Sequence, residues 1–294
     1  MLYIVQAGDT LFGIANRYKS SIQSIIGANI ICNPNYIFIG QPLIIPNPEV
    51  DLPKAGGSPY YVVNVGDSLW CLASQFSQSI QVVAEANQIK NINQIYVGQE
   101  LLIGVNQPNP TELFETWNIT EDECEFLNSA GLYGVYYLGS FLWESLGIRA
   151  LPYLKRLLTH PCMEVRYHAV MSLGRISTGG ETYTLLLQAT QDPDQNVAEL
   201  ASLAVKRFQL VQRWSKRVHV VTSDTLLFRN IDVSSSSTSI SRGTPVIVIR
   251  WYIPSPTGEV IPPGRLATFE LIQNLETGEV GYIERVGYGA IQLL

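Results

Sequence analysis

The sequence predicts a multidomain α+β protein. It has two small βααβ units at the N-terminal end, a short stack of helical repeats in the middle and an all-β domain at the C-terminal end. Three observations predict this order. A segment near the start returns 58 positions later, a helical pattern returns about 32 positions later, and β-rich runs dominate after Trp214. A chain of 294 residues has room for two to four domains.

The first observation is a duplication that keeps its register. Tyr3 to Tyr18 reads YIVQAGDTLFGIANRY, and Tyr61 to Phe76 reads YVVNVGDSLWCLASQF. In each copy a β-rich run leads to a Gly-Asp-Thr/Ser turn, where the Asp or the hydroxyl residue can cap the following helix. A second helix, a polar loop and a second strand complete the unit. We therefore predict two βααβ domains, 1–46 and 59–105, joined by a partly extended, mobile linker over 47–58.

The repeated residues resemble a known family. Each copy carries Tyr-x-Val-x-x-Gly-Asp-Thr/Ser-Leu near its start and Ile-x-x-Gly-Gln-x-Leu-x-Ile near its end. This pattern is similar to that of the LysM family, over about a third of the chain. The resemblance implies a βααβ fold that binds glycans containing N-acetylglucosamine, either peptidoglycan or chitin. Two modules in tandem would raise the avidity for a repetitive polymer.

In that family the sugar lies in a shallow groove between two loops. One loop joins the first strand to the first helix, and the other joins the second helix to the second strand. In the first copy the implied glycan-binding residues are Gly8, Asp9, Thr10, Leu11, Phe12, Asn35, Tyr36, Ile37 and Phe38. In the second copy they are Gly66, Asp67, Ser68, Leu69, Trp70, Asn93, Gln94, Ile95 and Tyr96.

The chemistry of these loops suits a sugar, but some members have a structural alternative. Glycine-containing turns leave backbone donors and acceptors open to N-acetyl groups, and aromatic rings offer apolar faces to pyranose rings. The two leucines at 11 and 69 alternatively serve the core, and the two aspartates at 9 and 67 serve as helix caps. Phe12 and Trp70 lie one residue past the core position, so they are expected to be exposed.

The middle region, 111–213, is predicted to form paired amphipathic helices. Leu151 to Leu158 and Val165 to Ile176 have helical apolar faces, and Pro161 separates them. The pattern resembles HEAT repeats, antiparallel helix pairs that stack into a small solenoid. Such stacks usually bind proteins, although a spacer is the alternative here.

Residues 111–149 are interpreted as a degenerate third repeat, with helices near 121–130 and 132–146. A capping box from Thr120 to Glu123 opens the first of these helices. The acidic run at its start is therefore a solvated helix terminus rather than a catalytic carboxylate pair.

The C-terminal region, 214–294, is predicted to be all-β. Leu226 to Arg229, Ser241 to Val246 and Thr277 to Ile283 resemble elements of a bacterial SH3-like barrel, a domain that often binds peptides in cell-wall proteins. The Pro-rich stretch 252–265 departs from that family, so the ligand stays open. Ser234 to Ser239 is predicted to be a flexible loop. The β-rich runs are Val218 to Val221, Thr225 to Arg229, Thr244 to Trp251, Leu266 to Gln273 and Gly278 to Ile283.

Composition excludes several classes of protein. The net charge is −6 and no basic run is present, which argues against nucleic-acid binding. No apolar run reaches the roughly 18–20 residues of a membrane span. No signal-peptide pattern precedes the first unit. We therefore expect cytoplasmic synthesis, either in a mother cell with assembly on a spore surface, as for signal-less LysM proteins of endospore-forming bacteria, or with cell-wall attachment by another route.

Cysteine and histidine usage predicts no redox or metal chemistry. The four cysteines lie in four different predicted elements without a CxxC pair, so reduced buried thiols are expected. His160, Cys162 and His168 fall close together, but zinc needs about four ligands at a recognisable spacing. We predict no metal and no cofactor.

No catalytic motif was found in the sequence. A GxSxG, a P-loop and an HExxH are all missing from it. The sequence therefore favours a non-catalytic glycan-binding protein whose helical and β regions hold a protein partner. The alternatives are a cell-wall hydrolase or an accessory that targets one, and an intracellular scaffold that binds no sugar.

Overall fold

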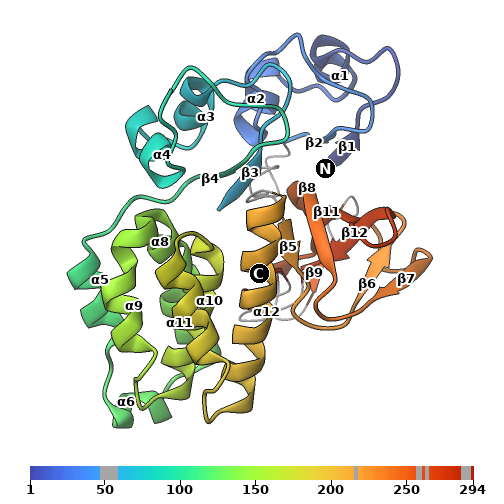
Figure 1. Cartoon of the computed structure of the whole chain (residues 1–294). Coiled ribbons are helices and arrows are strands. Elements are labelled where there is room, and N and C mark those ends of the chain that lie inside the picture. Colours follow the sequence, from blue (N-terminus) through green and yellow to red (C-terminus); the bar gives the residue numbers. More distant parts are fainter. Residues whose placement is uncertain (47–58, 215–217, 256–259, 262–264, 286–292) are drawn as a thin grey trace.

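The computed structural model describes residues 1–46, 59–214, 218–255, 260–261, 265–285 and 293–294. Two small βααβ units lie next to each other at the top of Figure 1, above a helical region and a C-terminal sheet that lie side by side. The predicted order of an α+β N-terminal part, a helical middle and an all-β end is confirmed. The predicted linker, 47–58, lies outside the described residues.

Both N-terminal units have two short antiparallel strands and two helices of seven residues. In the first unit Leu2 pairs with Ile44, and in the second Tyr60 pairs with Leu102. The elements of the first unit are β1 (Leu2–Ile4), α1 (Leu11–Arg17), α2 (Ile22–Ala28) and β2 (Pro42–Ile44). Those of the second are β3 (Tyr60–Val62), α3 (Leu69–Gln75), α4 (Ile80–Ala86) and β4 (Glu100–Leu102).

One repeated asparagine holds each unit together. The Asn29 side chain donates to the carbonyls of Ile25 and Ile44, both at 2.7 Å, and accepts from the Ile44 backbone N–H. Asn87 makes the same three bonds, to α4 and β4. Because two-stranded sheets are only marginally stable alone, these bonds are an important link between the second helix and the second strand of each unit.

The middle region is helical, and its core runs through α10, which contacts α8 on one side and α12 on the other. The elements are α5 (Pro110–Trp117), α6 (Glu121–Glu125), α7 (Ser129–Gly131), a π-helical segment (Leu132–Tyr137), α8 (Leu138–Leu146), a 3₁₀ turn (Gly147–Ala150), α9 (Leu151–Leu157), α10 (Met163–Ile176), α11 (Gly180–Ala189) and α12 (Gln195–Arg213).

The predicted helix near 121–130 was wrong in its extent. The capping box from Thr120 to Glu123 is present, but α6 ends at Glu125 and a separate turn starts at Ser129. Asn128 accepts from the Gly131 backbone N–H and so caps this new turn. The cap competes with continuation of α6.

The C-terminal region forms a six-stranded antiparallel sheet in the order β5-β8-β11-β12-β6-β7. Within the described residues β5 and β7 are not paired, so the sheet is open and a closed SH3-like barrel is not confirmed. Its strands are β5 (Val218–Val220), β6 (Thr225–Phe228), β7 (Ser237–Ile240), β8 (Pro245–Pro254), β11 (Thr268–Asn274) and β12 (Val280–Glu284). A separate pair consists of β9 (Val260–Ile261) and β10 (Arg265–Leu266).

The prediction of a flexible loop over 234–239 was wrong for its last residues. Ser237–Ile240 is β7, and Ser237 pairs with Phe228 on β6. An edge strand needs only backbone hydrogen bonds on one side, so exposed serines and threonines can form it. The serine-rich composition of this segment predicts a loop, so the strand was missed.

The expectation of reduced thiols was also wrong. The structure pairs Cys32 with Cys71 and Cys124 with Cys162, at Cα–Cα distances of 5.7 and 5.8 Å. These distances are typical of disulfides. Partners 39 and 38 residues apart meet only because the fold brings their elements together, so sequence spacing gave no sign of the pairing. The first disulfide joins the two N-terminal units.

Both N-terminal units pack apolar side chains against the sheet, and they differ in their polar contacts. The first unit packs Leu2 and Ile44 against Phe228, Ile253 and Phe269 in an apolar cluster. The second unit packs Val62 and Leu102 in a cluster with sheet residues that include Val248. It also contributes Tyr60 and Glu100 to a buried polar network. The two attachments hold both units on one side of the molecule (Figure 1).

The buried network joins all three parts of the chain. The Tyr60 hydroxyl donates to the Glu144 carboxylate of α8 and accepts from Arg175 of α10 at 3.2 Å. Glu100 accepts from the Trp251 indole N–H at 2.8 Å and lies 2.9 Å from His219 Nε2. Since unpaired buried polar groups are costly, this network favours one fixed docking of the second unit.

Candidate functional site

Large apolar side chains are exposed at matching positions of the two N-terminal units. Phe12 and Trp70, at the second position of α1 and α3, are 66% and 72% exposed. The same 58-residue offset relates two further exposed pairs in the loop before the second strand: Phe38 with Tyr96, and Ile39 with Val97. Exposed apolar patches of this kind indicate contact surfaces. The prediction that Phe12 and Trp70 are exposed is confirmed.

The turn between the first strand and the first helix is built alike in both units. Gly8 and Gly66 have φ of +83° and +88°, a region in which a side chain is strained, and both residues are solvent-exposed. The helix caps are Thr10, which accepts from the Gly13 backbone N–H at 3.0 Å, and Ser68, which accepts from that of Cys71. The turn therefore presents its backbone to solvent.

Asp9 and Asp67 are not the helix caps. The Tyr3 hydroxyl and the Gln6 backbone N–H both donate to Asp9 Oδ2, which ties the turn to the strand. The Tyr61 hydroxyl and the Asn64 backbone N–H, both at 2.7 Å, do the same for Asp67. Thr10 and Ser68 already cap the helices, so each carboxylate stabilises the turn instead.

The two carboxylates differ in their electrostatics. The Tyr3 hydroxyl, the Gln6 N–H and the guanidinium of Arg17, 3.2 Å away, lower the pKa of Asp9. Burial raises the pKa of Asp67 above its usual value despite the bonds from Tyr61 and Asn64. The same Gly-Asp turn therefore holds its carboxylate in two different electrostatic environments.

The remaining predicted residues divide into core and surface. Leu11 and Leu69 are buried in the cores of their units, so a ligand would meet their backbone rather than their side chains. In the second loop the Asn35 and Asn93 backbone N–H groups donate to the Asn33 and Asn91 side chains. The half-buried residues are Ile37 and Ile95, and the exposed ones are Asn35, Tyr36, Asn93 and Gln94.

The structure also brings the second loop of one unit to the first turn of the other. A small hollow between the units is lined by Tyr36 and Phe38 from the first unit and by Val65 and Asp67 from the second. The Cys32–Cys71 disulfide lies at this junction, since Cys32 lines the hollow and Cys71 follows Trp70 in α3. The two candidate grooves are therefore fixed relative to each other.

Sequence reasoning missed three parts of this surface. Ile39 and Val97 were not assigned to it, although an apolar residue directly before Gly40 and Gly98 repeats in both copies and signals the exposed pair. The Cys32–Cys71 disulfide had no such signal, because only the first copy has a cysteine at the position of Cys32 and only the second at that of Cys71.

The histidine and cysteine group at 160–168 is accounted for without a ligand. His160 accepts from the Cys162 backbone N–H at 3.0 Å and bonds the Ile119 carbonyl, and Cys162 is in a disulfide. Burial lowers the pKa of His168 to about 4. Across the described ranges no three His, Cys, Asp or Glu side chains gather as a metal site would require. Among the described helices none is long and apolar enough to cross a membrane.

Comparison with known families agrees with the geometry of the N-terminal units. Residues 3–46 and 61–104 both match the LysM domain model. The chain carries two LysM domains. Residues 150–179 match the HEAT repeat model, and this range covers α9 and α10. LysM homology indicates binding of carbohydrate of the chitin or peptidoglycan type.

The relatives match part of this chain rather than its whole length. The secreted LysM effector ECP6 of Passalora fulva is 34% identical over 45% of this chain and 64% of its own length. The N-acetylmuramoyl-L-alanine amidase sle1 of Staphylococcus aureus (strain USA300) is 34% identical over 35% of this chain and 34% of its own length. This chain thus spans about a third to two thirds of the curated relatives that it matches.

Among solved structures, the spore cortex-lytic enzyme SleL of Bacillus megaterium QM B1551 aligns over 96% of this chain and 88% of its own. The sequence identity is 13% and the TM-score is 0.17. A TM-score this low does not establish a common fold, and the alignment carries no functional argument.

Proposed function

We propose that this chain is a non-catalytic protein that binds a polymer of N-acetylglucosamine, peptidoglycan in the first place, and anchors a protein-interaction region at a cell wall or spore surface. The single observation that carries the proposal is the paired exposure of Phe12 and Trp70 beside open Gly-Asp turns in two LysM domains. Rigid aromatic faces next to accessible backbone groups suit the pyranose rings and N-acetyl groups of such a glycan.

A sedimentation assay tests the proposal. The full chain is incubated with insoluble peptidoglycan, and the retained fraction is measured for the wild type and for Phe12→Ala/Trp70→Ala. We expect the double variant to lose at least about tenfold in affinity, because each stacked ring contributes about 1 kcal/mol or more and the two act together. Soluble N-acetylglucosamine oligomers should displace the wild type.

The chain offers a matched control for this assay. Phe126 and Trp214 are 81% and 55% exposed and lie outside the LysM domains. Phe126→Ala/Trp214→Ala removes the same two ring types and should bind as the wild type does. No retention of the folded wild-type chain would contradict the proposal and favour a scaffold that binds no sugar.

The absence of catalysis is part of the proposal and has a separate test. The candidate surface contains turns, aromatic rings and two carboxylates that are each engaged with a tyrosine hydroxyl, rather than a nucleophile beside a base. Zymography of the purified chain on embedded peptidoglycan should therefore show no clearing. Clearing would assign a hydrolase activity to the chain. This is the alternative function, and the similarity to the amidase sle1 is the reason to test it.

The location of the protein is also a proposal. Two disulfides, Cys32–Cys71 and Cys124–Cys162, favour a place of action outside the reducing cytosol. A wall or spore surface satisfies this condition. Imaging of a tagged chain through growth and sporulation tests it, and a diffuse cytoplasmic signal throughout would contradict it.

The HEAT-like helices and the SH3-like sheet are proposed as the partner-binding part of the chain. The buried network through Tyr60 and Glu100 holds them rigidly against the second LysM domain. A partner bound there would consequently be carried to the glycan.

A further inference from the structure

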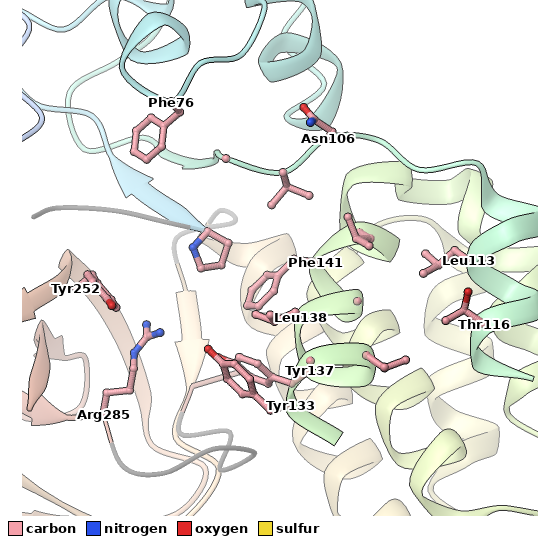
Figure 2. A pocket seen from close by; sticks show the side chains of 17 residues that line it. Phe76, Asn106, Leu113, Thr116, Tyr133, Tyr137, Leu138, Phe141, Tyr252 and Arg285 are labelled. Atoms are coloured by element: carbon pink, nitrogen blue, oxygen red, sulfur yellow. The ribbon is translucent and has the colours of Figure 1, made fainter. Parts of the chain in front are cut away.

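A large cavity lies where the second LysM domain, the helical region and the sheet meet. Its volume is about 1000 Å³, and it opens to solvent. Figure 2 shows Tyr252 and Arg285 of the sheet region on one side and Tyr133, Tyr137 and Phe141 of the helical region opposite them. Ligand pockets in proteins are about 300–1000 Å³ and often lie at domain junctions. This cavity reaches the upper end of that range.

Two irregularities of the backbone place tyrosine rings on the cavity wall. Leu132–Tyr137 is a π-helical segment, and Tyr133 and Tyr137 within it line the cavity and stack at 5.3 Å between ring centroids. Tyr252 has φ of +55° where the pairing of β8 with β11 shifts register. π-helical turns, β-bulges and left-handed non-glycine residues are costly and occur frequently at functional sites.

The one charged side chain on the described cavity wall is paired with a carboxylate. Arg285 is the one charged side chain among the described lining residues, and both its Nε and Nη2 lie within 2.7 Å of Glu270 Oε1. Behind the opposite wall the buried guanidinium of Arg175 lies 3.8 Å from the ring centroid of Phe141 and bonds the Tyr60 hydroxyl. On the described cavity wall a charged ligand therefore meets one charged side chain, which already has a carboxylate partner.

The lining is mainly aromatic and aliphatic. Apart from Arg285, its polar side chains are those of Asn106, Thr116 and three tyrosines. The hydroxyl groups of a sugar would outnumber these partners, and buried unpaired hydroxyls are costly. The apolar lining residues are Pro59, Phe76, Val105, Leu113, Val135, Leu138, Phe141 and Leu142.

We propose that this cavity binds a neutral, apolar small molecule that contains aromatic or alicyclic rings, held between the tyrosines of the π-helical segment and Tyr252. This site is distinct from the glycan surface, because it lies on the side of the second LysM domain that faces the body of the protein. It would give the chain a second ligand independent of the wall polymer.

A fluorescent probe tests the proposal on the full chain. N-phenyl-1-naphthylamine is neutral and made of rings, and its fluorescence rises in apolar surroundings. The variant Gly134→Leu should weaken its binding at least about tenfold, because Gly134 lines the cavity and a Cβ added there meets no atom within 4 Å, which leaves room for the leucine side chain. Gly27→Leu is the matched control: Gly27 is also helical and open to solvent, but it lies on α2 of the first LysM domain.

Each outcome decides the proposal. Saturable binding by the wild type and Gly27→Leu, with loss in Gly134→Leu, supports it. No binding by the wild type, or equal binding by all three chains, overturns it. The sulfonated analogue 8-anilinonaphthalene-1-sulfonate should bind no tighter than the neutral probe, and tenfold tighter binding overturns the neutral assignment. Displacement of the probe by N-acetylglucosamine oligomers overturns the separation from the glycan site.

A second variant keeps the test decisive if Gly134→Leu does not fold, as judged by circular dichroism and by retention on peptidoglycan. Val135→Phe enlarges a side chain that also lines the cavity and is 37% exposed, so the fold tolerates the change more readily. It should weaken the neutral probe and leave retention on peptidoglycan unchanged. Unchanged probe binding in this variant counts against the proposal.

Discussion

Leu2 and Tyr60 occupy the same position in the two LysM domains, and so do Pro42 and Glu100, 58 residues apart. In the first domain these positions are apolar, and Leu2 packs on the hydrophobic face of the sheet. In the second they are polar and enter a buried network with Glu144, Arg175, His219 and Trp251.

The comparison shows that the two copies of a duplicated domain share their internal hydrogen bonds and differ at the positions that contact the rest of the protein. The caps and the asparagine that joins helix to strand are alike in both copies. Apolar packing is non-directional, whereas hydrogen-bonded pairs fix one geometry. We therefore expect the second domain to determine the orientation of the glycan surface on the molecule.

The largest expected effect comes from the disulfides, which close loops of nearly equal length. Removing either one should destabilise the chain by about 4 kcal/mol in the chain-entropy estimate, since the separations are 39 and 38 residues. Cys32→Ser/Cys71→Ser and Cys124→Ser/Cys162→Ser should thus have similar urea midpoints.

The same two variants should differ in glycan binding. Only the first disulfide joins the LysM domains, so its removal should weaken retention on the long polymer more than binding of a short oligomer. The second variant should bind both as the wild type does. Equal loss of retention in the two variants would show that the disulfide between the domains does not organise the surface.

The next largest effect is expected at position 100 of the second domain, compared with the equivalent position 42 of the first. Glu100→Ala leaves His219 and the Trp251 indole N–H buried without their shared partner, at a cost of about 3 kcal/mol. Pro42→Ala at the equivalent position removes two buried CH₂ groups and should cost less, about 1.5 kcal/mol. Urea unfolding followed by tryptophan fluorescence measures both, and equal costs would refute the comparison.

A smaller difference is expected at the repeated asparagine. Asn29→Ala and Asn87→Ala each remove three hydrogen bonds to backbone groups, which we expect to cost about 1–3 kcal/mol. Asn29 is 1% exposed and Asn87 is only partly buried, so the first change should cost more. A larger loss for Asn87→Ala in the same unfolding assay would contradict this order.

Local features of the sequence predicted much of this fold. The helices at 11–17 and 22–28 follow from apolar spacing with Thr10 and Ser21 as caps. The same apolar spacing also predicted that Phe12 and Trp70, one residue past a core position, are exposed. Features that depend on tertiary approach were not predictable. The Cys32–Cys71 disulfide requires the two domains to meet at one orientation, and β7 depends on an edge of β6 rather than on its own serines.

The candidate site was predictable to a similar extent. Its backbone turns follow from Gly8 and Gly66, which sequence alone identified. The role of Asp9 and Asp67 was not predictable, because a carboxylate before a Thr or Ser is an equally good helix cap by sequence pattern. Only the position of the Tyr3 and Tyr61 hydroxyls, set by the strand, shows that each carboxylate fixes the turn instead.

The smallest expected effect concerns these two carboxylates. The pKa of Asp9 is lowered by the Tyr3 hydroxyl and the Gln6 N–H, with a contribution from Arg17, whereas burial raises that of Asp67. Asp9 therefore contributes stability that is present above its unfolded pKa and is lost as pH falls through its lowered folded pKa. Asp67 acts in the opposite sense: its contribution is lost as pH rises from its unfolded pKa through its raised folded pKa.

Carboxyl carbon chemical shifts followed by NMR across the acidic range would give both midpoints. We expect the midpoint of Asp9 below that of Asp67. Arg17→Gln installs the residue that the second copy has at this place, Gln75. It should move the Asp9 midpoint upward without reaching that of Asp67, because the bonds from the Tyr3 hydroxyl and the Gln6 N–H, which lower the pKa of Asp9 more than Arg17 does, remain. An Asp67 midpoint below that of Asp9 in the wild type would contradict the electrostatic difference between the two turns.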